Sequence, residues 1–69
     1  MYVLNMSVFE IVGSELCVAA DDGQKVYEQI AAALKQGWGV QLSFRNVTSL
    51  TSAFLNAAVG QLYGEFSPD

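Results

Sequence analysis

Histidine is absent from this 69-residue chain, and cysteine occurs once, at Cys17. Without histidine there is no Ser-His or Cys-His pair to activate a nucleophile, so we expect no enzyme and no catalytic residues. One cysteine permits no internal disulfide, which suits a reducing compartment, and we expect the protein in the cytoplasm. The same two shortages argue against a zinc or other soft-metal site. We therefore expect neither a metal nor another cofactor.

Basic residues are also few. Lys25, Lys35 and Arg45 are scattered along a chain whose net charge is −4. Nucleic-acid binding needs a Lys/Arg patch that neutralises phosphates, and an anionic membrane surface attracts the same kind of patch. The apolar runs are too short to span a bilayer, and the start MYVLNMS lacks the basic region of a signal peptide. We expect no nucleic-acid partner and no membrane association.

Charge of either sign is scarce. Only 14% of residues are charged and 52% are apolar, whereas about 25% are charged in an ordinary soluble domain. The length predicts a single domain, residues 1–69, near the lower limit for folding alone. The charges thin out along the chain, and after Arg45 only Glu65 and Asp69 remain. We expect another chain to cover part of the second half; alternatively, its Ser, Thr, Asn and Gln residues keep it soluble.

The first half predicts a strand followed by a helix. Apolar and polar residues alternate over 2–12, which favours a strand, and Gly13 ends it. Residues 15–20 form either a short second strand or an extended connection. Asp21, with Gln24 three residues later, resembles a capping box at the start of a helix over 24–36, and Gly37 is placed for a left-handed end of that helix.

The second half predicts another strand and another helix. Residues 38–44 alternate and follow the first helix so closely that a β-α-β unit with parallel strands is expected. Thr51 or Ser52 caps a helix that runs to about Tyr63. Together these elements predict a small α/β domain of βαβα order, with a mixed or parallel sheet and two helices packed on it.

The second helix contains no charged residue, and apolar side chains occur almost all around it. A helix of this kind is buried on more than one face, and a domain this thin has little of its own chain to cover the second face. We therefore predict a partner interface on this helix, formed by Phe54, Leu55, Asn56, Val59 and Leu62. The alternative is that small residues such as Ala are tolerated in water. At the start of the helix, Ser52 and Thr51 are either plain helix caps or a phosphoacceptor or anion site.

Two segments resemble a known family. "VQLSFRNVTSLTSAFLNAAVGQLYG" has a hydrophobic strand, a turn, and S/T-S-x-F-hydrophobic-N at the start of a helix; "ADDGQKVYEQIAAALKQGWGV" has a D/E-G-x-x-hydrophobic helix, a Gly and a Val-containing strand. Both resemble the STAS-like domain family of unknown function, and the resemblance covers residues 8–66. That family is similar to the bacterial anti-sigma-factor antagonists, which carry a phosphorylatable serine in a D-S-S-G-L turn at the start of a helix.

The resemblance implies a regulatory protein-binding role, with a histidine-kinase-like ATPase as the kind of partner. Against D-S-S-G-L this chain reads Thr51-Ser52-Ala53-Phe54-Leu55, so Ala53 stands at the usual phosphoacceptor position and has no hydroxyl. Related chains continue with another strand after the second helix. This chain, which stops at "EFSPD", is therefore expected to lack a C-terminal strand and to leave a sheet edge exposed.

Two functions follow as hypotheses. The first is a non-enzymatic regulatory module that binds a protein partner through the second helix, in the manner of the anti-sigma-factor antagonists. The second is a self-assembling module that forms a homo-oligomer through the apolar helix and the open sheet edge.

Overall fold

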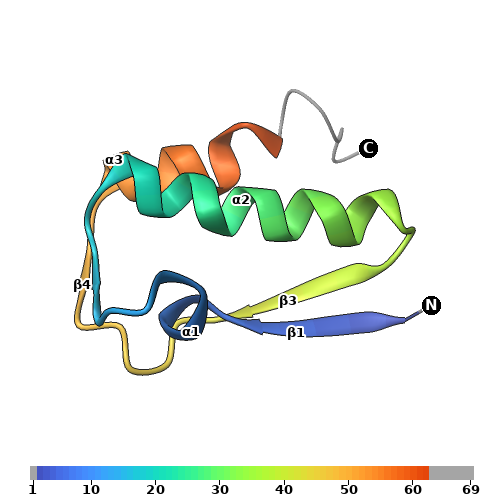
Figure 1. Cartoon of the computed structure of the whole chain (residues 1–69), viewed down its shortest axis with the longest axis horizontal. Coiled ribbons are helices and arrows are strands. Elements are labelled where there is room, and N and C mark those ends of the chain that lie inside the picture. The colour runs from blue at the N-terminus through green and yellow to red at the C-terminus, as the bar shows by residue number, and fades with distance from the viewer. Residues whose placement is uncertain (1, 63–69) are drawn as a thin grey trace.

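The computed structural model describes residues 2–62 and forms a small α/β domain, in which parallel strand pairs and the first, short helix lie on one side and the other helices lie on the opposite side (Figure 1). In chain order the strands are β1 (Val3–Ser7), β2 (Leu16–Cys17), β3 (Gly39–Ser43) and β4 (Ser49–Leu50). The helices are α1 (Val8–Val12), α2 (Ala20–Lys35) and α3 (Ser52–Leu55), and α3 continues into a π-helix, η1 (Asn56–Gly60). The prediction of an α/β domain with parallel strands is confirmed.

The strands form two separate parallel pairs. β1 pairs with β3 from Val3 opposite Gly39 to Ser7 opposite Ser43. β2 pairs with β4, with Cys17 opposite Leu50. The predicted β-α-β unit is therefore present, and its two strands are β1 and β3, which are connected through α1, β2 and α2.

The first predicted strand was too long. Residues 8–12 form α1 instead, because the hydroxyl of Ser7 accepts a hydrogen bond from the backbone N–H of Glu10 at 3.2 Å and caps a new helix. Gly13 ends α1 with φ of 79°, a left-handed conformation that glycine adopts at little cost.

The start of the long helix was also predicted wrongly. α2 begins at Ala20 and its N-cap is Ala19, which makes no side-chain capping bond, so Asp21 does not cap it. Asp21 and Asp22 lie within the first turn, where their charge suits the positive end of the helix dipole. Gly37 has φ of 83°, which confirms the predicted left-handed residue after the helix.

The core lies between the strands and the helices. The inward side of the β1–β3 pair supplies Met6 with the partly buried Leu4, Val40 and Leu42, and α2 supplies Val26, Ile30 and Ala33. Phe54 and Ala58, from α3 and η1, complete the cluster at 1% and 2% exposure.

α2 lies alongside α3 and η1, as the adjacent ribbons in Figure 1 show. Gly23 makes this approach possible: a Cβ there would meet the carbonyl oxygen of Phe54 and would lie 2.8 Å from Cβ of Ala57. At the same junction, the side-chain amide of Gln61 donates to Oε1 of Gln24 at 2.8 Å. α2, α3 and η1 thus form one tightly packed layer.

Candidate functional site

Thr51, at the start of α3, forms hydrogen bonds both to the end of β2 and to the first turn of α3. Its hydroxyl donates to the carbonyl oxygen of Val18 at 2.9 Å and accepts from the backbone N–H of Phe54 at 3.2 Å. Its own backbone N–H donates to the carbonyl oxygen of Cys17 at 3.2 Å. The prediction that Thr51 or Ser52 caps the helix is confirmed for Thr51, whose hydroxyl is fully engaged in holding α3 to β2.

Ser52 differs from its neighbour. It is the first residue of α3, it is exposed, and its hydroxyl bonds to no residue within 2–62. Ala53 beside it is also exposed. Of the two candidate phosphoacceptors, Ser52 is the one that a modifying enzyme could reach without breaking a hydrogen bond that the fold uses.

The structure separates the predicted interface residues of the second helix. Phe54 is 1% exposed, so it belongs to the core and its place in the predicted interface was wrong. Leu55, Val59 and Leu62 are partly buried and pack against the same core. Only Asn56 is exposed, and Tyr63, at the predicted end of the helix, lies outside the described residues.

The outward side of the second helix is therefore small and polar. Its exposed residues within the described part are Ser52, Ala53, Asn56, Gly60 and Gln61. This explains why the segment needs no charge: one side is covered by its own core, and the other exposes few apolar atoms to water.

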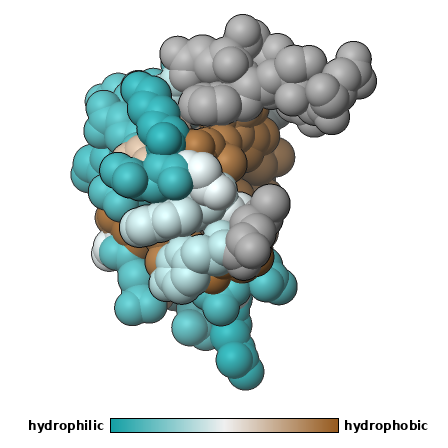
Figure 2. Space-filling model, turned by 90° about the vertical axis from the view of Figure 1, so that its right-hand side faces the viewer, coloured by the Kyte–Doolittle hydropathy of each residue, from teal (hydrophilic) through white to brown (hydrophobic). Residues whose placement is uncertain are grey.

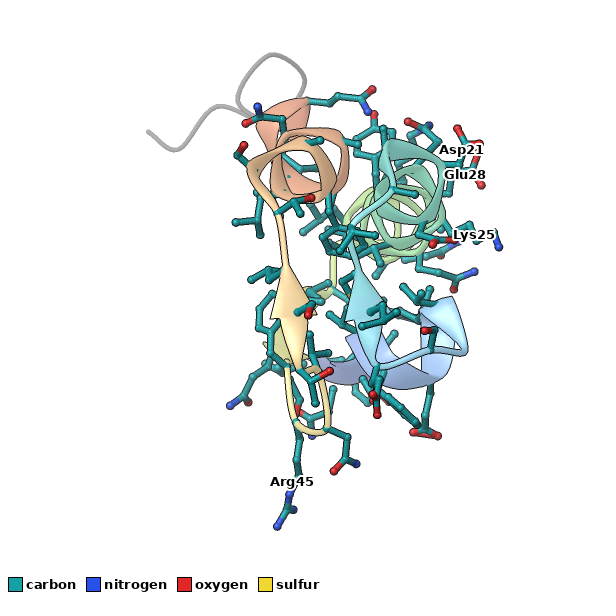
Figure 3. The ribbon with its side chains drawn as sticks, turned by 90° about the vertical axis from the view of Figure 1, so that its left-hand side faces the viewer. Asp21, Lys25, Glu28 and Arg45 are labelled. Atoms are coloured by element: carbon teal, nitrogen blue, oxygen red, sulfur yellow. The ribbon has the colours of Figure 1, made fainter. Side chains whose placement is uncertain are left out.

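Large exposed apolar side chains gather instead on the neighbouring strand pair. Leu16 and Val18 alternate with the fully buried Cys17, so they point away from the core, at 49% and 44% exposure. Leu50, on the paired strand β4, is also 44% exposed, but it lies opposite Cys17 and therefore points to the other face of the pair. We call the side of the pair that carries Leu16 and Val18 the β2–β4 face; Figure 3 shows β2 and β4 leading up to α2 and α3.

The surroundings of the β2–β4 face are acidic. Glu15 is exposed next to Leu16, and Asp21 and Glu28 are exposed on α2, at the upper right of Figure 3. Nζ of Lys25 lies 3.5 Å from Oδ1 of Asp22, so this ion pair neutralises part of the positive charge of Lys25. Arg45 extends from the loop at the foot of the same view, away from α3.

The interior of the site offers no reactive group. Cys17 is fully buried, and burial, together with the negative charge of Asp22, raises the pKa of its thiol. A raised pKa keeps the thiol protonated and unreactive near neutral pH. Residues 2–62 contain no group of three or more His, Cys, Asp or Glu side chains that could hold a metal ion.

A hollow of about 240 Å³ lies away from the β2–β4 face, between β1 and the far end of α2. Among the described residues its lining includes Leu4, Met6, Gln29, Ala33, Gln36 and Trp38, so the polar side chains that they contribute are two amides and the indole N–H. Ligand pockets are usually larger, about 300–1,000 Å³. No ionisable side chain from residues 2–62 lines this hollow.

The sequence missed the β2–β4 face, although it contained a signal. Leu16 and Val18 flank Cys17 in strict alternation, and a strand with apolar residues on both of its faces leaves one of them uncovered unless another layer exists. None of the helices within the described residues is long and apolar enough to cross a membrane.

Comparison with known proteins gives one match. The model of the family described as "STAS-like domain of unknown function (DUF4325)" matches residues 22–69. No curated protein and no solved structure matches the chain. The matched segment contains all of α2 except its first two residues, together with β3, β4, α3 and η1, and so includes both the helix junction at Gly23 and the start of α3. Since the match covers more than half of the sequence, the chain belongs to this family of STAS-like domains of unknown function.

Proposed function

We propose that this domain is a non-enzymatic regulatory module that binds a protein partner through the β2–β4 face and the start of α3. The observation that carries the proposal is the exposure of Leu16 and Val18 on one side of β2, in a chain with very few charges. Exposed apolar side chains that lie together beside polar residues are typical of protein-interaction sites. We therefore place the proposed interface on β2 and β4, and not on the second helix, where the sequence predicted it.

The chemistry of the face favours a particular kind of partner. Leu16 and Val18 lie on and next to a paired strand rather than in a hollow, which suits a protein surface better than a small ligand. The acidic side chains around them favour a partner whose apolar contact is bordered by Lys or Arg. Membership of a STAS-like family supports a regulatory partner, and a histidine-kinase-like ATPase is the candidate that the resemblance to anti-sigma-factor antagonists suggests.

Ser52 is the residue that we propose as a switch. A phosphoryl group there adds about two negative charges beside an apolar face that already has acidic neighbours. The added charge would change the affinity for a partner whose apolar contact is bordered by Lys or Arg, while the cap formed by Thr51 stays intact.

The test is a binding titration of the chain against a purified histidine-kinase-like ATPase from the same source. Val18→Asp places a charge on the β2–β4 face and is expected to raise the Kd at least about tenfold, a loss of about 1.4 kcal/mol or more. The matched control is Val3→Asp, because Val3 is exposed to a similar extent, 48% against 44%, and lies on β1. Equal weakening by both variants, or by neither, would contradict the proposal.

A self-assembling module is the second candidate. The observation that favours it is different: β1 and β3 form a sheet of only two strands among the described residues, so β3 has an open edge.

A further inference from the structure

The edge of β3 that faces away from β1 is unpaired within residues 2–62. Isolated two-stranded sheets are at best marginally stable in water, and parallel strands are usually covered on both faces and continued on both sides. Natural edge strands are commonly protected by Lys, Pro or a bulge. β3, Gly39–Ser43, has the sequence GVQLS and contains none of these residues and no charge.

The backbone of β3 shows which groups this edge offers. The N–H of Gly39 donates to the carbonyl oxygen of Tyr2 at 2.9 Å, so Gly39 directs its backbone groups toward β1. Successive residues of a strand direct their backbone groups to opposite sides. Val40 and Leu42 therefore direct their N–H and C=O groups to the open edge, while their side chains join the core.

The sequence around β3 is nearly symmetric about Gln41. On each side of Gln41 the residues are, in order, aliphatic, small and aromatic: Val40, Gly39 and Trp38 in one direction, and Leu42, Ser43 and Phe44 in the other. The two aromatic residues are also equally exposed, at 39% for Trp38 and 40% for Phe44. An antiparallel copy of the same strand, centred on Gln41, therefore brings chemically matching residues opposite each other.

The hydrogen bonding fits that same register. With Gln41 opposite the second Gln41, Val40 lies opposite Leu42 of the other copy, and these are the residues whose backbone groups point outward. In an antiparallel pair, opposed residues that exchange both hydrogen bonds alternate with residues that exchange none. Val40 and Leu42 then form the bonded pairs, and Gln41 forms the close, unbonded pair on the twofold axis.

We propose that β3 pairs with β3 of a second copy of this chain, antiparallel and centred on Gln41, to give a four-stranded sheet. The order of strands is β1-β3-β3-β1, and the helices of both copies lie on one face. The proposal does not depend on the partner proposed for the β2–β4 face. The uncharged edge lets two chains that each carry a net charge of −4 approach there.

Gln41 supplies the first test, because its side chain is exposed and its backbone already bonds to β1. Gln41→Lys places a lysine opposite the same lysine of the other copy, with the two Cα atoms about 4.5 Å apart, so that their ammonium groups repel each other. The matched control is Asn5→Lys, which introduces the same charge away from the twofold axis. Asn5 is exposed and lies opposite Gln41 in the β1–β3 pair. By analytical ultracentrifugation we expect a dimer for the unmodified chain and for Asn5→Lys, with a dimer Kd at least about tenfold higher for Gln41→Lys.

Gln41→Cys tests the register itself. The Cα separation at an unbonded antiparallel pair lies within the range that a disulfide can bridge, about 4.4–6.8 Å. Mild oxidation is expected to cross-link this variant into a covalent dimer and to leave Asn5→Cys monomeric on a non-reducing gel, since Cys17 is buried. A monomeric unmodified chain at high micromolar concentration would overturn the proposal. So would a dimer that Asn5→Lys weakens as much as Gln41→Lys, or equal cross-linking through position 5. None of these results bears on Val18 and the β2–β4 face.

Discussion

The helical side and the strand side of this domain differ in how completely their large apolar side chains pack against the rest of the chain. On the helical side, α2 meets α3 and η1 through Gly23, and Gln61 bonds to Gln24 across the junction. On the strand side, two separate two-stranded pairs expose Leu16, Val18, Leu50 and Phe44 at 40–49%. The most apolar helix in the sequence is thus largely covered by its own chain.

The difference shows that apolar composition alone does not locate an interface. α3 and η1 contain more apolar residues than β2 and β4, but α2 covers them with a second helix. α1 lies beside the strands, and α2, α3 and η1 lie on the opposite side (Figure 1). In Figure 2 hydrophobic surface, coloured brown, reaches the outside in the upper part of the molecule, at the level of the helices. Exposed apolar surface is therefore not confined to the strands.

The largest effect is expected from a phenylalanine on the helical side. Phe54→Ala removes a side chain that is 1% exposed, at a cost of about 3–5 kcal/mol. A chain of this length has a total unfolding free energy of about 3–10 kcal/mol, so we expect a largely unfolded protein by circular dichroism. Phe44→Ala, on the strand side and 40% exposed, is the control and should cost less than about 1 kcal/mol in the same dilute solution. Similar losses for the two variants would remove the distinction between the sides.

The close approach of the helices gives the next prediction. Gly23→Ala inserts a methyl group against the carbonyl oxygen of Phe54 and Cβ of Ala57, so α2 must move away, at a cost of about 1–3 kcal/mol in urea unfolding. At Gly60 the nearest atom to an added Cβ is Cβ of Asn56, at 3.8 Å, which is an ordinary contact. Gly60→Ala should therefore be neutral or stabilising by up to about 1 kcal/mol, as in other helix interiors. Destabilisation by Gly60→Ala that equals the loss at Gly23 would argue against a specific contact.

The junction between the two sides gives the smallest effect. Thr51→Ala removes both the cap of α3 and the bond to Val18, and should lower the free energy of unfolding by about 1–2 kcal/mol. Ser52→Ala removes a hydroxyl that bonds to no residue within 2–62, and should change stability by less than about 0.5 kcal/mol. Thermal melting of the two variants compares these losses directly. A larger loss at Ser52 would mean that its hydroxyl has a structural role.

Much of the fold could be predicted from periodicity. Val26, Ile30 and Ala33 recur at helical spacing and are all buried, and the alternation of Val40 and Leu42 with polar residues matches β3. α1 was missed because Val8, Ile11 and Val12 are β-branched and favour a strand. The competing signal was Ser7 followed three residues later by Glu10, a capping-box pattern that sets a helix start.

The candidate site was harder to predict than the fold. The cap at Thr51 follows from local sequence, but its bond to Val18 joins residues 33 positions apart and depends on the pairing of β2 with β4. The same long-range pairing decides that Leu16 and Val18 are exposed, and the packing of α2 on α3 decides that Phe54 is not. The alternation around Cys17 indicates that one side of the strand is left uncovered, but no local pattern decides which side, or that Phe54 is buried.

The π-helix at Asn56–Gly60 has a consequence for how this domain can vary. Its hydrogen bonds span five residues instead of four, so this wide turn holds one residue more than an ordinary turn would. Removing a single residue there would let the turn narrow to α-helical geometry. Five residues of the wide turn and four of an ordinary one complete about the same rotation, so Leu62 would still face the core. We therefore expect a one-residue deletion within Asn56–Gly60 to be tolerated better than the same deletion within Ala20–Lys35.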